Sequence, residues 1–399
     1  MRRDEVVSRI CDVVVRECLT AFGSRLISVI LTGSAARGEA TVVSSGNGWK
    51  ILGDAEFLVV VHQAGKAASI RSRDTVKRQS AEKLRSQGIE VEIGLGLVPA
   101  SYFKELPPYI FSYELRECGK VISGDRQILD LIPKFAASVI SHEDAWRLLC
   151  NRMIEQLDFI RDLEQTPRQI TNRLHYATVK LYLDMATSYL VFAGAYAPTY
   201  GERAQRVMTS ASEARHDAPF PMREFGARVE ECTSWKLNGS DDGRNCSLQF
   251  WQEAISYAHQ LWRWEILQMT GASSDCTDIE LWMRLAGTIT AREKIRGWLS
   301  VVKRSSVLEG LRNWPRWLKL GCRATPRYWV YRAGVEVLFD LHSRMSAAPK
   351  ETLLKLADLP VASDLPVFPR RASGVEISWE LAASEITANY WKYVAETRA

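Results

Sequence analysis

Apolar and polar positions alternate along the first hundred residues with two different periods. Helical spacing of apolar residues predicts an amphipathic helix near the N-terminus and a second, more basic helix further on. Short apolar or alternating runs, each bounded by a glycine or a turn signal, predict strands between and after these helices. In chain order, the predicted helix, two strands, helix and strand cover residues 3–21, 26–31, 56–61, 66–87 and 89–95. This order is typical of a unit that mixes helices with one sheet.

The remainder of the chain has mainly helical spacing. Helices are predicted at 141–163, 172–191, from 198 onward, at 248–271, at 278–300 and at 376–397. The sequence therefore predicts an α+β protein, with an N-terminal domain at 1–130 on a small mixed sheet and a mostly helical region at 131–399. A further division of that region near 273 or within the Pro-, Ala- and Ser-rich stretch 345–374 stays open.

Composition narrows the class of protein. The 399 residues are 46% hydrophobic and 25% charged, as in soluble globular proteins. A net charge of +5 is small for this length, so composition alone does not indicate a protein that coats nucleic acid. The sequence contains no apolar run long enough for a transmembrane segment, and its eight cysteines include no Cys-x-x-Cys pair. We expect a cytoplasmic protein with reduced thiols.

Two short motifs carry the candidate chemistry. Gly33-Ser34 follows the first predicted strand, and a turn of this kind offers backbone N–H groups and a hydroxyl to phosphate. Asp54 and Glu56 stand two positions apart on the next strand, so their carboxylates share one face. Carboxylate oxygens are the ligands that Mg²⁺ prefers, together with phosphate oxygens and water. The pair therefore predicts a metal site facing a nucleoside triphosphate.

A third carboxylate is predicted on the following strand. Glu90 and Glu92 share one face there, and either can ligate a metal or take a proton from an attacking hydroxyl. Glu92 is preferred for its Val-Glu-Ile-Gly context, and Glu90 remains the alternative. Arg37 can reach a phosphate or base, or can instead pair with Glu39.

These residues resemble the nucleotidyltransferase superfamily, which includes polymerase-β-like enzymes. The matching elements are the apolar strand, Gly33-Ser34, Arg37-Gly38-Glu39, Asp54-x-Glu56 and the later strand acid, within residues 26–97. A weaker likeness at 180–200 resembles the helical domain of bacterial minimal and aminoglycoside-adenylyltransferase-type enzymes.

The resemblance implies an activity and a set of site residues. It implies transfer of a nucleoside monophosphate, with AMP favoured, from a triphosphate such as ATP to a hydroxyl acceptor, with release of pyrophosphate. Two Mg²⁺ ions are implied, with Mn²⁺ as a substitute, on Asp54, Glu56 and Glu92. Nucleotide contacts are implied for Gly33, Ser34, Arg37 and Lys180.

The sequence departs from the family pattern in two ways. Nineteen residues separate Ser34 from Asp54, so we expect a surface loop at 41–53 that shapes or covers the site. The second acid, Glu56, is a glutamate where aspartate is commoner. A catalytically silent nucleotide-binding sensor is therefore an alternative function.

Two further patterns have more than one possible role. Arg173, Tyr176, Lys180 and Asp184 share one helix face, which is either solvated or a wall of the active-site cleft. Segment 292–332 holds eleven basic residues against two glutamates, with tryptophans and tyrosines interleaved. It predicts either an RNA-binding surface that stacks bases, or an anionic membrane surface contact around 314–320, or a basic helix face whose rings turn into the core.

Overall fold

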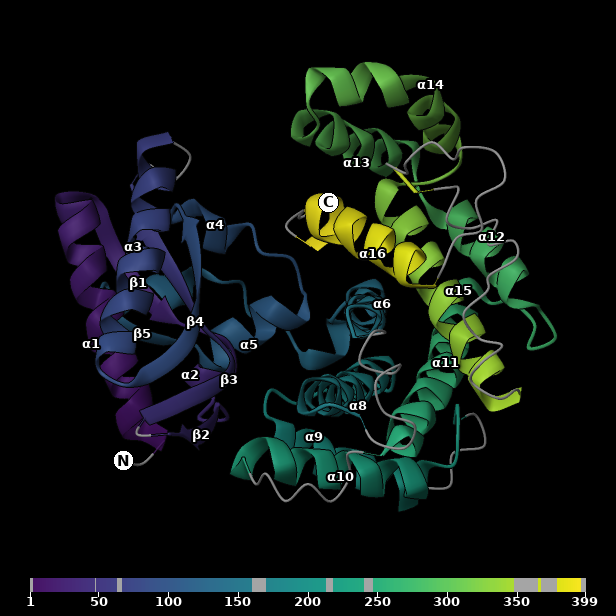
Figure 1. The fold of residues 1–399 in the computed structure, drawn as a ribbon, viewed down its shortest axis with the longest axis horizontal. Coiled ribbons are helices and arrows are strands. Elements are labelled where there is room, and N and C mark those ends of the chain that lie inside the picture. The colour runs from purple at the N-terminus through teal and green to yellow at the C-terminus, as the bar shows by residue number, and fades with distance from the viewer. Residues whose placement is uncertain are drawn as a thin grey trace. The chain divides into compact units, whose positions relative to one another are not determined.

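The computed structural model describes two compact units (Figure 1). It describes residues 3–46, 48–62, 67–159, 170–212, 218–239, 247–347, 365–366 and 379–395. The first unit contains Met1–Asp144, Leu190–Ala214 and Gly226–Asp242, and the second contains Ala145–Tyr189, Arg215–Phe225 and Gly243–Ala399. The first unit thus takes two segments from the region predicted as a separate helical domain. Most of the predicted connection at 345–374 lies outside the described residues.

A five-stranded mixed sheet forms the centre of the first unit. Its strands are β1 (Leu26–Leu31), β2 (Thr41–Ser45), β3 (Gly48–Val61), β4 (Ile89–Val98) and β5 (Lys120–Gly124). The hydrogen-bonded order is β2-β3-β1-β5, and β4 pairs with β3. Only the β3–β4 pair is parallel, because the helix α3 (Ala67–Ser86) connects them as a crossover.

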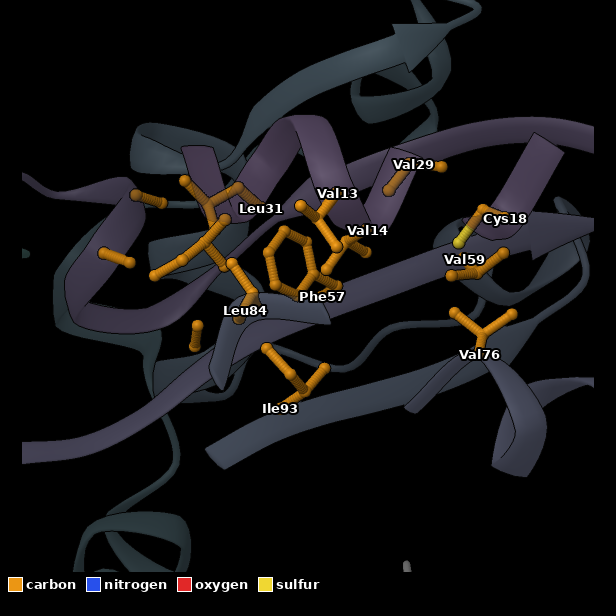
Figure 2. Close-up of a cluster of buried hydrophobic side chains, with 14 of the residues drawn as sticks. Val13, Val14, Cys18, Val29, Leu31, Phe57, Val59, Val76, Leu84 and Ile93 are labelled. Atoms are coloured by element: carbon orange, nitrogen blue, oxygen red, sulfur yellow. The ribbon is translucent and has the colours of Figure 1, made fainter. Parts of the chain in front are cut away.

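Helices cover both faces of this sheet. Helices α1 (Arg3–Phe22) and α3 pack on one face, where Val13, Phe57 and Ile93 belong to one buried cluster (Figure 2). The other face packs Leu58 and Val60 against the short helices α4 (Ser101–Lys104) and α5 (Ile110–Cys118). Alternate residues of β3 therefore serve two cores, and each fully buried large apolar side chain contributes about 1.5–3 kcal/mol.

The predicted loop at 41–53 is wrong. Strand β2 pairs antiparallel with the first half of β3, from Thr41 opposite Leu52 to Ser45 opposite Gly48. The turn signal was in the right place, since Gly46 adopts φ +57° at the tip. Apolar β-branched residues on either side, such as Val43 and Ile51, extend the turn into a hairpin that lengthens β3 to fourteen residues.

The helices predicted after residue 130 are present, with one correction, and three further helices at 222–238, 307–323 and 326–347 were not predicted individually. Outside the first unit's core they are α6 (His142–Leu157), α8 (Asn172–Phe192), α9 (Tyr200–Ser212), α10 (Met222–Asn238), α11 (Leu248–Thr270), α12 (Asp278–Thr288), α13 (Ala291–Arg304), α14 (Val307–Arg323), α15 (Pro326–Ala347) and α16 (Trp379–Tyr390), which ends in a π-helical turn at Trp391–Ala395. The single helix predicted at 278–300 is two helices. Thr290 accepts a hydrogen bond from the Glu293 backbone and starts α13 with a capping box.

Aromatic side chains fill the core of the second unit. Trp251, Trp262 and Trp282 are fully buried, and the rings of Trp262 and Trp282 lie 5.1 Å apart. None of the helices in the described segments combines the length and apolar character needed to cross a bilayer.

Candidate functional site

The turn after β1 lies directly against the carboxylate of Glu56. The Thr32 backbone N–H donates to the Glu56 carbonyl at 2.8 Å, which fixes the end of β1 beside β3. Gly33 follows with φ +63° and begins the single helical turn α2 (Gly33–Ala36). A Cβ atom at Gly33 would lie 2.0 Å from Glu56 Oε2. Only glycine therefore allows this turn and this carboxylate to approach so closely.

The predicted acids gather on one face of the sheet. Asp54 lies opposite Glu92 in the parallel β3–β4 pair, and Glu56 lies opposite Gly94. Neighbouring strands run roughly 4.8 Å apart, and facing residues project from the same side. A Cβ atom at Gly94 would be 3.4 Å from both Asp54 Oδ2 and Glu56 Cγ, so these two side chains lean together over that glycine. Asp54, Glu56 and Glu92 are all exposed.

The two candidates for the third carboxylate have different surroundings. Glu90 pairs across the strands with Lys50, whose Nζ lies 2.6 Å from Glu90 Oε1. Glu92 faces Asp54, and its Oε1 lies 3.9 Å from Lys77 Nζ. The register of β3 shifts by two residues between Lys50 and Asp54, so Glu92 rather than Glu90 lies level with the Asp54–Glu56 pair.

The donor set at this face fits a hard divalent cation that is completed by substrate. Among the described residues, no group of three or more His, Cys, Asp or Glu side chains is placed to hold a metal ion. Mg²⁺ is commonly bound by one or two carboxylates together with phosphate oxygens and water, and Asp54 and Glu56 meet that requirement. Metal ligation by Asp54, Glu56 and Glu92 stays a prediction.

A small pocket opens beside the Gly33 turn. Its volume is about 50 Å³, and Gly33, Arg37 and Glu56 line it together with Phe111 and Glu114 of α5. Space of this size holds only a few water molecules, so it is not a complete nucleotide cavity. It places the edge of α5 next to the Glu56 carboxylate.

Arg37 lies inside an ion-pair network. Its side chain is 5% exposed, and Nε donates to Glu39 at 2.8 Å while Nη1 donates to Glu114 at 2.5 Å. Burial acts to lower the pKa of Arg37, but the charge of Glu114 and the hydrogen bond to Glu39 hold that pKa above its ordinary value. The salt-bridge alternative is the one the structure adopts, whereas the nucleotide contact of Arg37 stays a prediction.

The same network ties the start of α9 and the segment before it to the Gly33 turn. Glu114 also accepts from Tyr196 Oη at 2.5 Å and from Arg203, and Glu39 accepts from the Tyr200 backbone N–H at 2.6 Å. Arg203 is 3% exposed and lies over the Tyr196 ring at 4.9 Å. Two guanidinium groups thus face two carboxylates in a low-dielectric setting, where unpaired charge is costly.

Lys180, predicted to contact the nucleotide, belongs to the second unit. It is partly exposed on α8, and its Nζ lies 5.8 Å from the Tyr176 ring centroid. Asp184, one helical turn further, is buried and accepts from Arg152 Nε at 2.6 Å. The predicted stripe is therefore not a uniformly solvated face. The nucleotide role of Lys180 stays a prediction.

The aromatic residues of segment 292–332 mostly turn inward. Trp298, Trp317, Tyr328, Trp329 and Tyr331 are buried, and Trp314 is 51% exposed. The indole N–H groups of Trp298 and Trp329 donate to the backbone carbonyls of Ala324 and Leu320. Five of the six rings are thus buried, as expected for a basic helix face whose rings turn into the core, and RNA binding by this segment stays a prediction.

Sequence reasoning missed the residues that surround the turn. Glu114 lies 77 positions from Arg37, 82 from Tyr196 and 89 from Arg203, so no local spacing connects it to these partners. Arg37-Gly38-Glu39 gave a partial signal, because a guanidinium two positions from a carboxylate can pair with it, as Arg37 does with Glu39.

The chain was compared with known families, proteins and structures. No family model matches it, and no curated protein matches it in sequence. Among solved structures it is similar to the spectinomycin adenyltransferase AAD(9) from Enterococcus faecialis, solved with ATP and spectinomycin. That similarity has 14% sequence identity and a TM-score of 0.35, and covers 62% of this chain and 96% of that chain. A likeness this weak carries no conclusion about the function of this chain.

Proposed function

We propose that this protein is a metal-dependent nucleotidyltransferase. It moves a nucleoside monophosphate, with AMP favoured, from a nucleoside triphosphate to a hydroxyl acceptor and releases pyrophosphate. One observation carries the proposal: the Gly33 turn packs on the Glu56 carboxylate while Asp54 lies opposite Glu92 on the same exposed face. A phosphate-accepting turn and clustered acids are the two parts that this chemistry needs side by side.

Each group has a distinct task in this proposal. The acceptor oxygen forms a bond to the α-phosphorus, the bond from that phosphorus to the bridging oxygen breaks, and the electron pair leaves with pyrophosphate. The turn at Gly33-Ser34 binds and orients phosphate oxygens, and Glu92 takes the proton of the acceptor hydroxyl. Asp54 and Glu56 would hold Mg²⁺, which neutralises charge on the phosphate oxygens.

The test is pyrophosphate release from ATP and Mg²⁺ in the presence of a panel of hydroxyl acceptors or cell extract. Asp54→Asn removes a carboxylate charge and should lower the rate about 100- to 1,000-fold, equivalent to roughly 3–4 kcal/mol of transition-state stabilisation. Asp74→Asn on α3 is the matched control, because Asp74 pairs with Arg73 on its own helix and should leave the rate unchanged.

Further variants separate the candidate third carboxylates. Glu92→Gln should lower the rate by a similar factor, whereas Glu90→Gln should break only the pair with Lys50. A wild-type rate in Asp54→Asn would refute the proposal. Tight ATP binding by the unaltered protein, without release of pyrophosphate from ATP in the presence of any acceptor, would also refute it, in favour of a silent nucleotide sensor.

A further inference from the structure

Helix α14 exposes a continuous stripe of large apolar side chains. Val307, Leu311, Trp314 and Leu318 follow one another at intervals of four, three and four residues, so they lie along one helix face. Val307 is 80% exposed, Leu311 is 73% exposed, and Leu308 at the edge of the stripe is 81% exposed. Single exposed apolar residues are ordinary, but a contiguous stripe on one helix marks an interaction surface.

Basic side chains border this stripe. Arg312, Lys319 and Arg323 fall at intervals of seven and four residues, along the flank next to the apolar face, and all three are exposed. The only acid of α14 is Glu309, which is held by Lys392 Nζ at 2.8 Å. The flank therefore presents positive charge, and the one acid of its helix is already paired with Lys392.

Helix α13 repeats the arrangement. Ile295, Leu299 and Val302 are exposed at intervals of four and three residues. Three exposed basic residues lie next to this second stripe on the helix, at positions Arg292, Arg296 and Lys303. The two helices lie side by side (Figure 1), with the rings of Trp298 and Trp317 6.3 Å apart.

The opposite faces of both helices are fixed to the unit. Trp317 and Leu320 of α14 are buried, as are Trp298 and Val301 of α13. Trp317 Nε1 donates to the Pro366 carbonyl at 2.7 Å. The helices are therefore held by their aromatic faces, and the aliphatic stripes are what they present outward.

We propose that the α13–α14 surface docks on an anionic lipid bilayer. A helix with an aliphatic and tryptophan stripe beside lysines and arginines is the pattern that inserts at the boundary between headgroups and acyl chains. The apolar stripe gains from leaving water, and the basic flank complements anionic headgroups. Nucleic acid fits less well, because the exposed side chains are aliphatic and only Trp314 of the segment's six rings offers an exposed face.

Vesicle co-sedimentation of the 399-residue chain tests this surface. The protein should bind vesicles of phosphatidylcholine with 30% phosphatidylserine about tenfold or more tightly than pure phosphatidylcholine, and rising salt should weaken the binding. Leu308→Ser with Leu311→Ser should lose binding about tenfold or more, as should Arg312→Glu with Lys319→Glu. These positions are exposed, so thermal unfolding should stay near that of the unaltered protein.

Matched controls keep the result specific. Arg71→Glu with Arg78→Glu makes the same charge change on exposed positions of α3 in the first unit and should leave vesicle binding unchanged apart from a small net-charge effect. A dye sensitive to polarity on Cys322, which is exposed near the end of α14, should shift to the blue with anionic vesicles, with Cys322→Ser as the labelling control.

Three outcomes would overturn the proposal. The first is no binding to anionic vesicles at low ionic strength. The second is equal binding by the Leu308→Ser, Leu311→Ser variant. The third is an unaltered protein that does not bind vesicles but self-associates in sedimentation velocity or binds RNA, with that association lost in the Leu308→Ser, Leu311→Ser variant. Self-association would assign the stripe to a second copy of the chain, and RNA binding would assign it to nucleic acid.

Discussion

Gly33→Ala is the sharpest test of how the turn and the acids cooperate. The substitution places a methyl group where Glu56 Oε2 now lies, with only 2.0 Å between the new Cβ and that oxygen. The Glu56 carboxylate is at the tip of a flexible side chain, so it should move away from the turn while β1 and β3 keep their pairing. The variant should therefore stay folded and lose the arrangement of the site.

The stability cost can be worked from the backbone. Gly33 has φ +63°, where an L-residue costs about 1–2 kcal/mol, and alanine recovers about 0.4–1 kcal/mol because it restricts the unfolded chain. The net loss is about 1 kcal/mol, or roughly 2–4 °C in Tm for a domain of 150–250 residues. A carboxylate displaced by about 1 Å is expected to lower kcat about 100-fold.

Gly38→Ala provides the control for this experiment. Gly38 has φ +76°, and a Cβ atom there meets no atom within 4 Å, so the variant carries the same backbone strain without touching Glu56. Tm from calorimetry should fall similarly in both variants, and pyrophosphate release should fall only in Gly33→Ala. Equal rates in the two variants would refute the role assigned to the contact between Gly33 and Glu56.

Two further predictions concern buried ionisable groups. Glu114→Ala leaves two buried guanidinium groups with one carboxylate and should destabilise the first unit by about 3–5 kcal/mol in thermal unfolding, whereas the exposed Glu117→Ala on the same helix should change little; equal shifts would contradict the network. Burial raises the pKa of Glu265 to about 8, so the folded state keeps a proton that the unfolded state releases above about 4.5. Stability should therefore fall as pH rises from about 4.5 to about 8, by up to about 1.4 kcal/mol per unit. The free energy of unfolding of Glu265→Gln, measured with urea, should not fall over this pH range. Equal pH dependence in the variant and the unaltered protein would contradict the prediction.

Local patterns were sufficient for the elements that hold the acids. The strand at 26–31 and the helices at 3–21 and 66–87 match β1, α1 and α3 within a residue or two, because a buried face imposes strict periodicity. The spacing of Asp54 and Glu56 on a strand was enough to predict a shared face. The register that puts Glu92 rather than Glu90 opposite Asp54 was not predictable, because it depends on a two-residue shift in β3.

Other features depended on contacts that spacing does not contain. Glycine and serine at 44–48 predicted a loop, although the flanking valines and isoleucine continue as paired strands. The helix break at Ile289 was readable in principle, since Thr290 and Glu293 form a capping box. The Arg37–Glu114–Arg203 network joins parts of the chain with no shared local signal. Burial of Trp317 beside the exposed Trp314 depends on which side of α14 meets the unit.

The discontinuous first unit has a consequence for protein synthesis. Arg203 and Tyr200 reach Glu114 and Glu39 only after the ribosome has added the helices of residues 145–189. At about 5–20 residues per second, translation from residue 144 to residue 203 takes roughly 3–12 s. During that interval Glu39, Glu114 and Arg37 have been synthesised, but Tyr200 and Arg203 have not. A chain truncated at residue 144 should therefore be less stable than the intact first unit.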